Sequence, residues 1–446
     1  MSDARSTGTV IVGDGPAAWI MALAISRGAP ARVTVITQPS PGDVDPYGPA
    51  LTAPPAIRDH HADLGLHDAE VMAAAVPLFG LALEGWGDAP AFIPFGQTGA
   101  DMASVTFHQQ LARLDRLDAL ADHSLSAQAA RRRRYAPPST DPASFLSTLD
   151  HGLSLDAGPY AALLRRHALK AGATVIEGAV GTVERAPSGA VAAVSLADGA
   201  TVPGDLFIDA SGPAAVLTDA PLQSWASDLP FDRLQVETTP DSEPPLHLVF
   251  RTPGDGLERD APLPGRRVQA RLTRGGDGAP FQPGRRDRFW DRNVIAVGAA
   301  AQVLPPLGAG ALHLIHRAAG HLVRLWPATA DGAVEAREFD RLMTAEVEAD
   351  RDFALMLLRR QGAVLTAPAA HRLALFEARG RVSRREQEPF TSGFLAAALL
   401  ASGVRPRRVD PMAEALDPAM LAARADRIRG LATRTADALP PWSPAP

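Results

Sequence analysis

The chain has 446 residues, of which 46% are hydrophobic, and this is enough for a buried core and for two or three domains. It contains no cysteine, which excludes disulfides, thiolate metal ligands and thiol catalysis. The net charge of −6 argues against nucleic acid as a partner, and no apolar run reaches the length of about 18 residues that a membrane helix needs. We therefore expect a cytoplasmic protein without a membrane span. The basic run RRRR at residues 131–134 is expected to be a solvated loop.

The N-terminal segment predicts a nucleotide-binding βαβ unit. The stretch GTVIVGDGPAAWIMALAISRGAPARVTVI, residues 8–36, has the pattern of an apolar strand, a glycine turn, an apolar helix and a second strand. Gly13 and Gly15 would allow the backbone to approach a pyrophosphate closely, and Ala18 stands where a third glycine normally packs the helix on the strand. The second strand ends in Thr37 instead of the usual acidic residue, so we expect a weaker contact with the ribose.

The remaining elements follow in chain order. We expect a helix in PYAALLRRHALKAGA, residues 159–173, and then two strands around a turn at residues 187–189. Residues 204–213 and 288–327 each predict a buried strand that runs into a turn of small residues. The intervening segment is rich in Pro, Gly and Asp, with strands expected at residues 245–251 and 266–274. From residue 328 the pattern is mainly helical, and it ends in a frayed LPPWSPAP tail.

Three separated nucleotide-type pieces in this order resemble the flavin-binding domain of p-hydroxybenzoate hydroxylase. The predicted fold class is α/β, with an FAD-binding, Rossmann-like three-layer domain, a smaller substrate-side β-rich layer and a helical C-terminal region. We expect residues 1–213 and 288–330 to form the FAD-binding domain, with residues 55–150 contributing to the substrate side. Residues 214–287 would be a short substrate-side insert, and residues 331–446 the helical region.

Six stretches of the chain, in family order, resemble the flavin-dependent tryptophan halogenases. They are PPAIRDHHADLGLHDAEVMAAAVPLFGLALEGW, FIPFGQTG, LSLDAGPYAALLRRHALKAGATVIEG, FIDASG, PGRRDRFWDRNVIAVG and VDPMAEALDPAMLAARADRIRGLATRTADALP. The resemblance implies FAD as cofactor, a separate reductase that supplies reduced flavin, and a small aromatic or peptide-like substrate. A homodimer is an open alternative.

In this family a lysine delivers the halogen and a glutamate assists it. The lysine motif, a Lys-Leu-Gly triplet about eight residues before a tryptophan, aligns with LFGLALEGW and places Leu78 at the lysine position and Trp86 at the tryptophan. Leucine can neither form a haloamine nor donate a hydrogen bond. The chain has a single lysine, Lys170, in a helix that corresponds to a peripheral part of the family. The family signature GWxWxIP has no counterpart between Ala214 and Asp287.

The glycine-rich turn VLPPLGAGALHLIH, residues 303–316, departs from the family in the same direction. The family pattern Glu-Pro-Leu-Glu-Ser-Thr-Gly aligns so that Pro305 and Gly308 replace both glutamates, and Ala309 and Gly310 replace the serine and threonine. The backbone of such a turn could still present N–H groups to flavin or to an anion. The predicted cofactor-binding residues are Gly13, Gly15, Ala18, Thr37, Gly298, Pro306, Gly308, Gly310 and Ala311.

Histidines supply the remaining acid–base candidates. His313 and His316 share a helix face, but no acidic partner lies close by in sequence, so we expect packed or flavin-adjacent histidines and no metal site. His108, together with His60 and His61, borders the substrate side by resemblance, although a surface role competes with an acid–base role for each of these three. The candidate catalytic residues are therefore His313, His316 and His108.

Three functions stay open from the sequence. The leading hypothesis is an FAD-dependent monooxygenase or oxidase on the halogenase scaffold that does not use the lysine route. A noncatalytic flavin-binding or partner subunit is the second hypothesis. A halogenase with an atypical delivery residue is the third.

Overall fold

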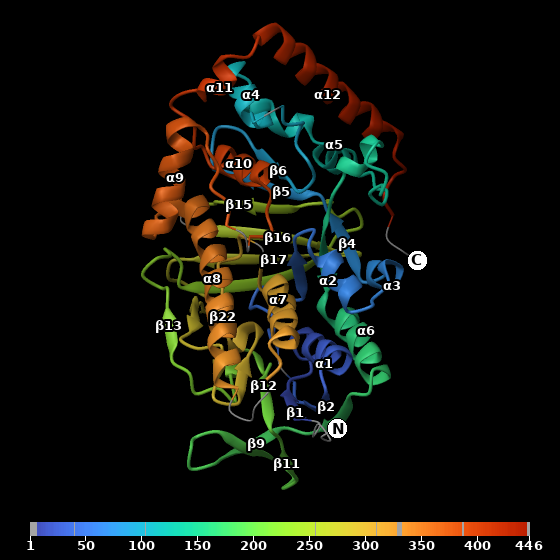
Figure 1. Ribbon diagram of the computed structural model, residues 1–446, viewed down its shortest axis with the longest axis vertical. Coiled ribbons are helices and arrows are strands. Elements are labelled where there is room, and N and C mark those ends of the chain that lie inside the picture. Colours follow the sequence, from blue (N-terminus) through green and yellow to red (C-terminus); the bar gives the residue numbers. More distant parts are fainter. Residues whose placement is uncertain are drawn as a thin grey trace.

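The computed structural model describes residues 7–39, 41–102, 104–254, 256–308, 310–327, 332–385 and 388–443. Its elements lie along one long axis: the N-terminal βαβ unit is near one end, a broad sheet crosses the middle, and the last helices of the chain are at the other end (Figure 1). Ala309 of the glycine-rich turn lies outside the described residues.

The nucleotide-type sheet has six strands and is parallel except for β20 at its edge. In spatial order the strands are β20 (Trp290–Asp291), β21 (Val294–Ala296), β12 (Leu206–Asp209), β1 (Thr7–Val12), β2 (Ala31–Thr37) and β8 (Thr174–Glu177). The parallel strands are short and mostly apolar, as expected when helices or a second sheet cover both faces. The three predicted pieces, residues 8–36, 204–213 and 288–327, therefore meet in one sheet.

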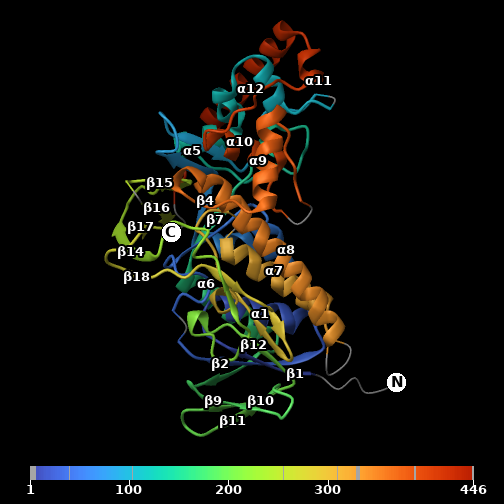
Figure 2. The same ribbon diagram turned by 90° about the vertical axis from the view of Figure 1, so that its left-hand side faces the viewer.

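Helix α1 (Pro16–Gly28) forms the centre of the first core. All ten of its residues from Pro16 to Ile25 are buried, because α6 (Ala157–Lys170) and α7 (Gly310–Arg324) pack against it. A helix that is apolar on every side needs such a complete cover. A three-stranded antiparallel meander, β9 (Val180–Arg185), β10 (Val191–Leu196) and β11 (Thr201–Pro203), extends below the sheet, as Figure 2 shows.

A second, seven-stranded sheet crosses the middle of the molecule. Its order is β18 (Ala279–Pro280), β14 (Arg233–Pro240), β17 (Arg266–Thr273), β16 (Leu257–Leu263), β15 (Leu248–Arg251), β5 (Gly80–Glu84) and β6 (Ala91–Pro94). Strands β15 and β17 confirm two sequence predictions. The pairing of β15 with β5 is parallel and joins the 214–287 segment to a segment 167 residues earlier, with Leu248 opposite Leu81.

Two small sheets connect these layers. One consists of β3 (Ala50–Ala53), β7 (Gly152–Asp156) and β4 (Ala75–Leu78), and the other of β13 (Leu222–Ser224), β19 (Gly284–Arg286) and β22 (Gln302–Val303). Four short helices, α2 (Ile57–Asp63), α3 (Asp68–Met72), α4 (Phe107–Arg113) and α5 (Leu125–Arg132), and two 3-10 turns, η1 (Leu117–His123) and η2 (Phe145–Thr148), lie between residues 57 and 148. Two further 3-10 turns, η3 (Gly212–Ala214) and η4 (Gly298–Ala300), follow strands β12 and β21 of the nucleotide-type sheet.

The C-terminal region is helical, as predicted. Helix α8 (Ala333–Leu358) runs from the nucleotide-type unit to the second sheet (Figures 1 and 2). It is followed by η5 (Arg359–Gln361), α9 (Ala367–Arg379), α10 (Ser392–Ala401), α11 (Pro411–Glu414) and α12 (Pro418–Ala438). The last half of α8 and α9–α10 form a second hydrophobic core with the seven-stranded sheet.

The described part of the tail differs from the expected frayed end. Pro441 pairs with Arg134, the Trp442 amide donates to the Arg133 carbonyl at 2.9 Å, and the Trp442 ring packs beside a buried cluster. Overall the α/β fold class is confirmed, including the β-rich layer and the helical C-terminal region. Among the described helices, none combines the length and apolar character needed to cross a bilayer.

Candidate functional site

The first part of the site is the turn between β1 and α1. Gly13 has a φ of +145°, and a Cβ there would collide with the Ala210 carbonyl oxygen and lie 3.2 Å from the Cβ of Ala18. Only glycine allows this packing of the turn against β12, and the small Ala18 lets the helix approach it. The predicted roles of Gly13 and Ala18 in close packing therefore have a physical basis in the structure.

The N-terminus of α1 holds an anionic side chain of this same chain. Asp43, in the loop after β2, accepts a 2.9 Å hydrogen bond from the amide of Ala17, and its carboxyl group lies where a Cβ on Gly15 would be. The carbonyl of Asp43 also accepts the Ala299 amide at 2.8 Å. A helix N-terminus stabilises an anion through its exposed amides and its dipole. The loop carboxyl thus occupies the type of position that a pyrophosphate takes in such folds.

This observation tests whether the residues fit FAD. The glycine turns at Gly13, Gly212 and Gly298 lie around the loop, each with positive φ. The Ala17 amide at the α1 N-terminus donates to the Asp43 carboxyl group. The framework suits a diphosphate, provided that the segment around Asp43 moves away. Burial raises the pKa of Asp43 to about 7, with the charge of Asp45 adding to the effect.

Thr37, the predicted ribose contact, uses its hydroxyl on the neighbouring strand. The Oγ1 atom donates to the carbonyl of Ile176 in β8 at 3.5 Å, which is a long hydrogen bond. To bond a ribose hydroxyl, Thr37 would have to give up only this weak hydrogen bond to Ile176.

The second part of the site is the glycine-rich turn between β22 and α7. Gly308 has a φ of +127° and Gly310 a φ of +80°, so both need the freedom of glycine. A Cβ on Gly310 would lie 3.1 Å from the carbonyl oxygen of Thr52 in β3. A Cβ on Gly308 would lie only 2.7 Å from Cγ of Asp350, a residue of α8. A carboxylate from another element therefore fills the space beside the position where the family carries its glutamate.

Leu78, at the position of the family lysine, is fully buried at the end of β4. Its side chain belongs to the apolar cluster that includes Leu81, Phe250 and Leu357. Lys170 is exposed at the last residue of α6, on the nucleotide-type unit. The single lysine of the chain therefore lies on α6 and not in the apolar cluster around Leu78.

A buried cation, which the sequence analysis did not single out, lies at the junction of the two parts. Arg259 on β16 is 2% exposed, and its Nη2 donates to the Ala50 carbonyl and to Thr52 Oγ1, each at 3.0 Å. Its guanidinium lies 5.7 Å from the centre of the Tyr47 ring. Among the described residues, Nη1 of Arg259 has no hydrogen-bond partner. Because Thr52 also contacts Gly310, Arg259 lies one residue away from the glycine-rich turn.

The segment around Arg259 explains why it was missed. Residues 256–262 read GLERDAP, which keeps the glycine and the proline of the GWxWxIP signature at their spacing but has Leu257 and Arg259 at the tryptophan positions. The spacing of Gly256 and Pro262 could have identified this segment from the sequence. A search for the two tryptophans of the signature does not find it, because neither tryptophan is present.

The histidines of α2 and α7 form one buried group. His60 Nε2 lies 3.2 Å from His313 Nδ1, and Tyr160 Oη lies 2.8 Å from His61 Nε2 and 3.1 Å from His316 Nε2. The rings of His60 and His316 are stacked with their centres 5.3 Å apart. Burial lowers the pKa of each of the four histidines, to about 3 for His61 and His313, so the rings are neutral at pH 7. Among the described side chains, no group is arranged to hold a metal ion.

His108 is not part of this group. Its Nδ1 lies 3.1 Å from Thr106 Oγ1, its Nε2 bonds the Gly380 carbonyl at 2.7 Å, and its ring stacks on Phe376. Both nitrogens are used in joining α4 to α9. The structure therefore brings together His313 and His316 of the three candidates, with His60 and His61, and leaves His108 in a packing position.

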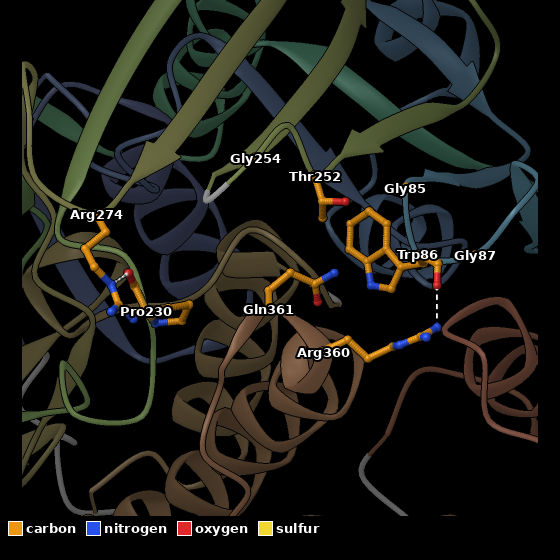
Figure 3. Close-up of a pocket in the computed structure, with 9 residues that line it drawn as sticks. All are labelled: Gly85, Trp86, Gly87, Pro230, Thr252, Gly254, Arg274, Arg360 and Gln361. Carbon is orange, nitrogen blue, oxygen red and sulfur yellow. Dashed lines mark hydrogen bonds between the residues drawn. The ribbon is translucent and has the colours of Figure 1, made fainter.

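Two further cavities lie away from the buried histidines. One of about 590 Å³ opens between the ends of β5 and β15 and the η5 turn, and Figure 3 shows Trp86, Arg274, Arg360 and Gln361 around it. Trp86 is held by two hydrogen bonds. Its indole Nε1 donates to the Leu357 carbonyl at 2.8 Å, and its backbone carbonyl accepts from Arg360 at 2.7 Å. A more apolar cavity of about 450 Å³ lies under the C-terminal tail beside Tyr135 and His151.

The parallel sheet, its three glycine turns and the attached β-rich layer define a dinucleotide-binding protein of the flavoprotein type. The chain belongs to the tryptophan halogenase family, whose model matches residues 8–248 and 266–418. It is similar to BrvH, a flavin-dependent halogenase from Brevundimonas sp. BAL3, with 29% identity over 98% of both chains and a TM-score of 0.88. Xcc4156, a flavin-dependent halogenase from Xanthomonas campestris, has 28% identity over 99% of both chains and a TM-score of 0.88.

A more distant structure shows the reach of the fold. The tryptophan 6-halogenase SttH from Streptomyces toxytricini shares the fold at 21% identity over 98% of both chains, with a TM-score of 0.84. The family resemblance drawn from the sequence is therefore confirmed. The match omits residues 249–265, the segment that carries Arg259.

Proposed function

We propose that this chain is an FAD-dependent oxidoreductase that oxidises a small aromatic or peptide-like substrate without delivering halogen through a lysine. FAD is the cofactor of this scaffold, and a separate reductase supplies it in reduced form. When bound, reduced FAD supplies the electrons that activate oxygen. The observation that carries the proposal is the buried Leu78 in a chain whose single lysine lies on α6.

The residues of the chain would divide the work as follows. The α1 N-terminus and the turns at Gly13, Gly15 and Gly298 would hold the diphosphate once the Asp43 loop is released, and Ala18 and Thr37 would support that side. Pro306, Gly308, Gly310 and Ala311 would present the turn to the flavin ring. Residues 7–213 and 288–327 would form the FAD-binding part. The 214–287 segment would cover the substrate.

A halogenase with an atypical delivery residue is the second candidate, and Arg259 is the observation in its favour. Its buried guanidinium retains an Nη1 donor without a partner among the described residues, beside the glycine-rich turn. A halide or another small anion could be stabilised by such a group. Arginine remains protonated, however, so it is a poorer nucleophile for forming a haloamine than lysine.

One experiment separates these functions. The purified chain is titrated with FAD, reduced with a flavin reductase and NADH, and supplied with oxygen and a panel of indoles, phenols and an indole-containing peptide, with and without bromide. An oxygenated product that forms equally without bromide supports the leading proposal, and a brominated product supports the second candidate. Absence of FAD binding, or reoxidation of bound flavin without any product, would contradict both and favour a noncatalytic subunit.

A further inference from the structure

The glycine-rich turn lacks its glutamate, yet a carboxylate occupies the adjoining space. Asp350, on the inner face of α8, is 6% exposed, and a Cβ on Gly308 would lie 2.7 Å from its Cγ and 2.8 Å from its Oδ2. Any residue other than glycine at position 308 would therefore displace this side chain. Asp350 can hold its present position on α8 only because residue 308 is glycine and has no side chain.

Asp350 borders a small cavity that both polar and apolar residues line. The cavity has a volume of about 20 Å³, and its lining residues include Asp350, Glu346, Glu388 and His313, along with Phe353 and Phe390. A water molecule needs about 10–15 Å³ of such space and two or more polar partners. The cavity thus has room for a single water between Asp350 and His313.

The other two carboxylates at this cavity are held by cations. Glu346 accepts from Arg317 at 2.6 Å and from His321 at 2.9 Å. Glu388 and Arg372 form a buried bidentate pair, at 2.5 and 3.0 Å. Arg317 and His321 thus bind Glu346, and Arg372 binds Glu388. Of the three acids, Asp350 is the one in contact with the turn.

His313 connects the cavity with the surface. Its Nδ1 is 3.2 Å from His60 Nε2, which leaves Nε2 of His313 for the cavity that the ring lines. His60 is half-buried and lines an open groove of about 490 Å³ between α1, α2 and α7, together with Asp63, His316 and Arg317. A neutral imidazole carries one N–H and one acceptor nitrogen, so two in series can pass a proton.

We infer that Asp350 replaces the missing carboxylate of the glycine-rich turn as the proton-handling residue of the site, and that His313 and His60 connect it to the solvent. The inference rests on the proposed oxidation at this turn. In the outward direction, Asp350 takes a proton released at the turn and passes it through the cavity water to Nε2 of His313. His313 gives its Nδ1 proton to Nε2 of His60, and His60 releases its Nδ1 proton to the groove. One proton enters and one leaves, and no electron is transferred.

Two variants and one control test the inference. Asp350→Asn keeps the shape but removes the acid, and we expect product formation in a single turnover to fall about 100-fold, the lower end for the loss of an acid–base group. His60→Ala interrupts the path nearer the surface, and a fall of about tenfold that added imidazole reverses is expected. Glu338→Gln removes an exposed carboxylate from the same helix and should change nothing.

A measurement without flavin gives an independent readout. Histidine ¹⁵N NMR spectra of the cofactor-free chain should show the His313 ring resonances shifted by Asp350→Asn and unchanged by Glu338→Gln, because only the first variant alters the cavity. If Asp350→Asn does not fold, His60→Ala with imidazole rescue decides the matter.

The outcomes distinguish this inference from the proposed function. A wild-type chain that binds FAD but gives no product contradicts the proposed function, whatever the variants do. A wild-type chain that is active while Asp350→Asn and His60→Ala both keep their rates within about twofold overturns the inference alone. Slowing in His60→Ala that imidazole does not reverse would also overturn the proton path.

Discussion

Single residues decide which chemistry this scaffold can perform. Asp43 is the clearest case on the cofactor side, because its carboxyl group, bonded to the Ala17 amide, holds the position that a diphosphate needs. FAD must therefore compete with a group that belongs to the chain itself. The outcome of this competition depends on pH, because burial raises the pKa of Asp43 from 3.8 to about 7.

FAD affinity should rise between about pH 4 and pH 7 and level off above. With a raised pKa, Asp43 binds its proton more tightly when seated than when released, so the seated loop is favoured at low pH and loses this advantage as the pH rises through about 7. The gain should approach tenfold per pH unit at most. Titration of the quenching of flavin fluorescence at each pH measures it. Asp43→Asn, which stays neutral but still accepts a hydrogen bond, should give a flat profile, and a slope equal to that of the wild type would refute the competition.

Leu78 decides the chemistry on the substrate side. Leu78→Lys would place an ammonium in an apolar cluster without a described acidic partner, and we expect a loss of at least about 3 kcal/mol in the free energy of unfolding, measured with urea. Leu78→Met, a swap of similar volume, should cost less than about 1.5 kcal/mol. A stable Leu78→Lys chain that brominates an indole would show instead that the lysine route needs only this one residue.

At the scale of elements, the pattern of burial determined what the sequence could reveal. Strand β17 alternates buried residues with more exposed ones, and α1 is apolar from Pro16 to Ile25, so both could be predicted. Strand β16 buries Arg259 and Asp260 among apolar residues, which hides its alternation, and most of β14 is exposed. Within the site, the glycine turns were evident, but the proximity of Asp350 to Gly308 depends on how α8 crosses α7. No local pattern contains that information.

Strand β16 provides a prediction of its own. Arg259→Met removes a buried cation that has no carboxylate within salt-bridge distance among the described residues, and a hydrophobic residue of similar length avoids its desolvation cost. We expect the free energy of unfolding to stay within about 1 kcal/mol or to increase, while any effect of bromide on the melting temperature disappears. A loss of more than about 2 kcal/mol in urea unfolding would mark Arg259 as a structural tie between β16 and β3.

At the scale of the whole molecule, the C-terminal helix α12 and the tail that follows it lie against α5. The four arginines at residues 131–134, expected in a solvated loop, all bind within the protein: Arg131 with Asp122, Arg132 with Asp437, Arg133 with Glu243 and Arg134 with the Leu439 carbonyl. Exposed pairs contribute about 0–1 kcal/mol each, so they fix the position of the tail more than they stabilise the fold.

The ring of Trp442 should contribute more to stability than these pairs. It covers the apolar cavity beside Tyr135 and His151, so Trp442→Ala should lower the free energy of unfolding by about 1–3 kcal/mol, whereas Trp442→Phe should retain most of it. Urea unfolding followed by circular dichroism measures both. Equal stability of the alanine variant and the wild type would mean that the tail is not held in solution.

The single lysine has a practical consequence. Lys170 is exposed at the end of α6, the helix that packs against α1, and the chain has no cysteine. Apart from the N-terminal amine, amine-reactive dyes would find one side chain, and maleimides would find none until a cysteine is introduced. A donor dye on Lys170 and an acceptor on a cysteine placed in the 41–46 loop would then report directly, by energy transfer, whether that loop leaves α1 when nucleotide arrives.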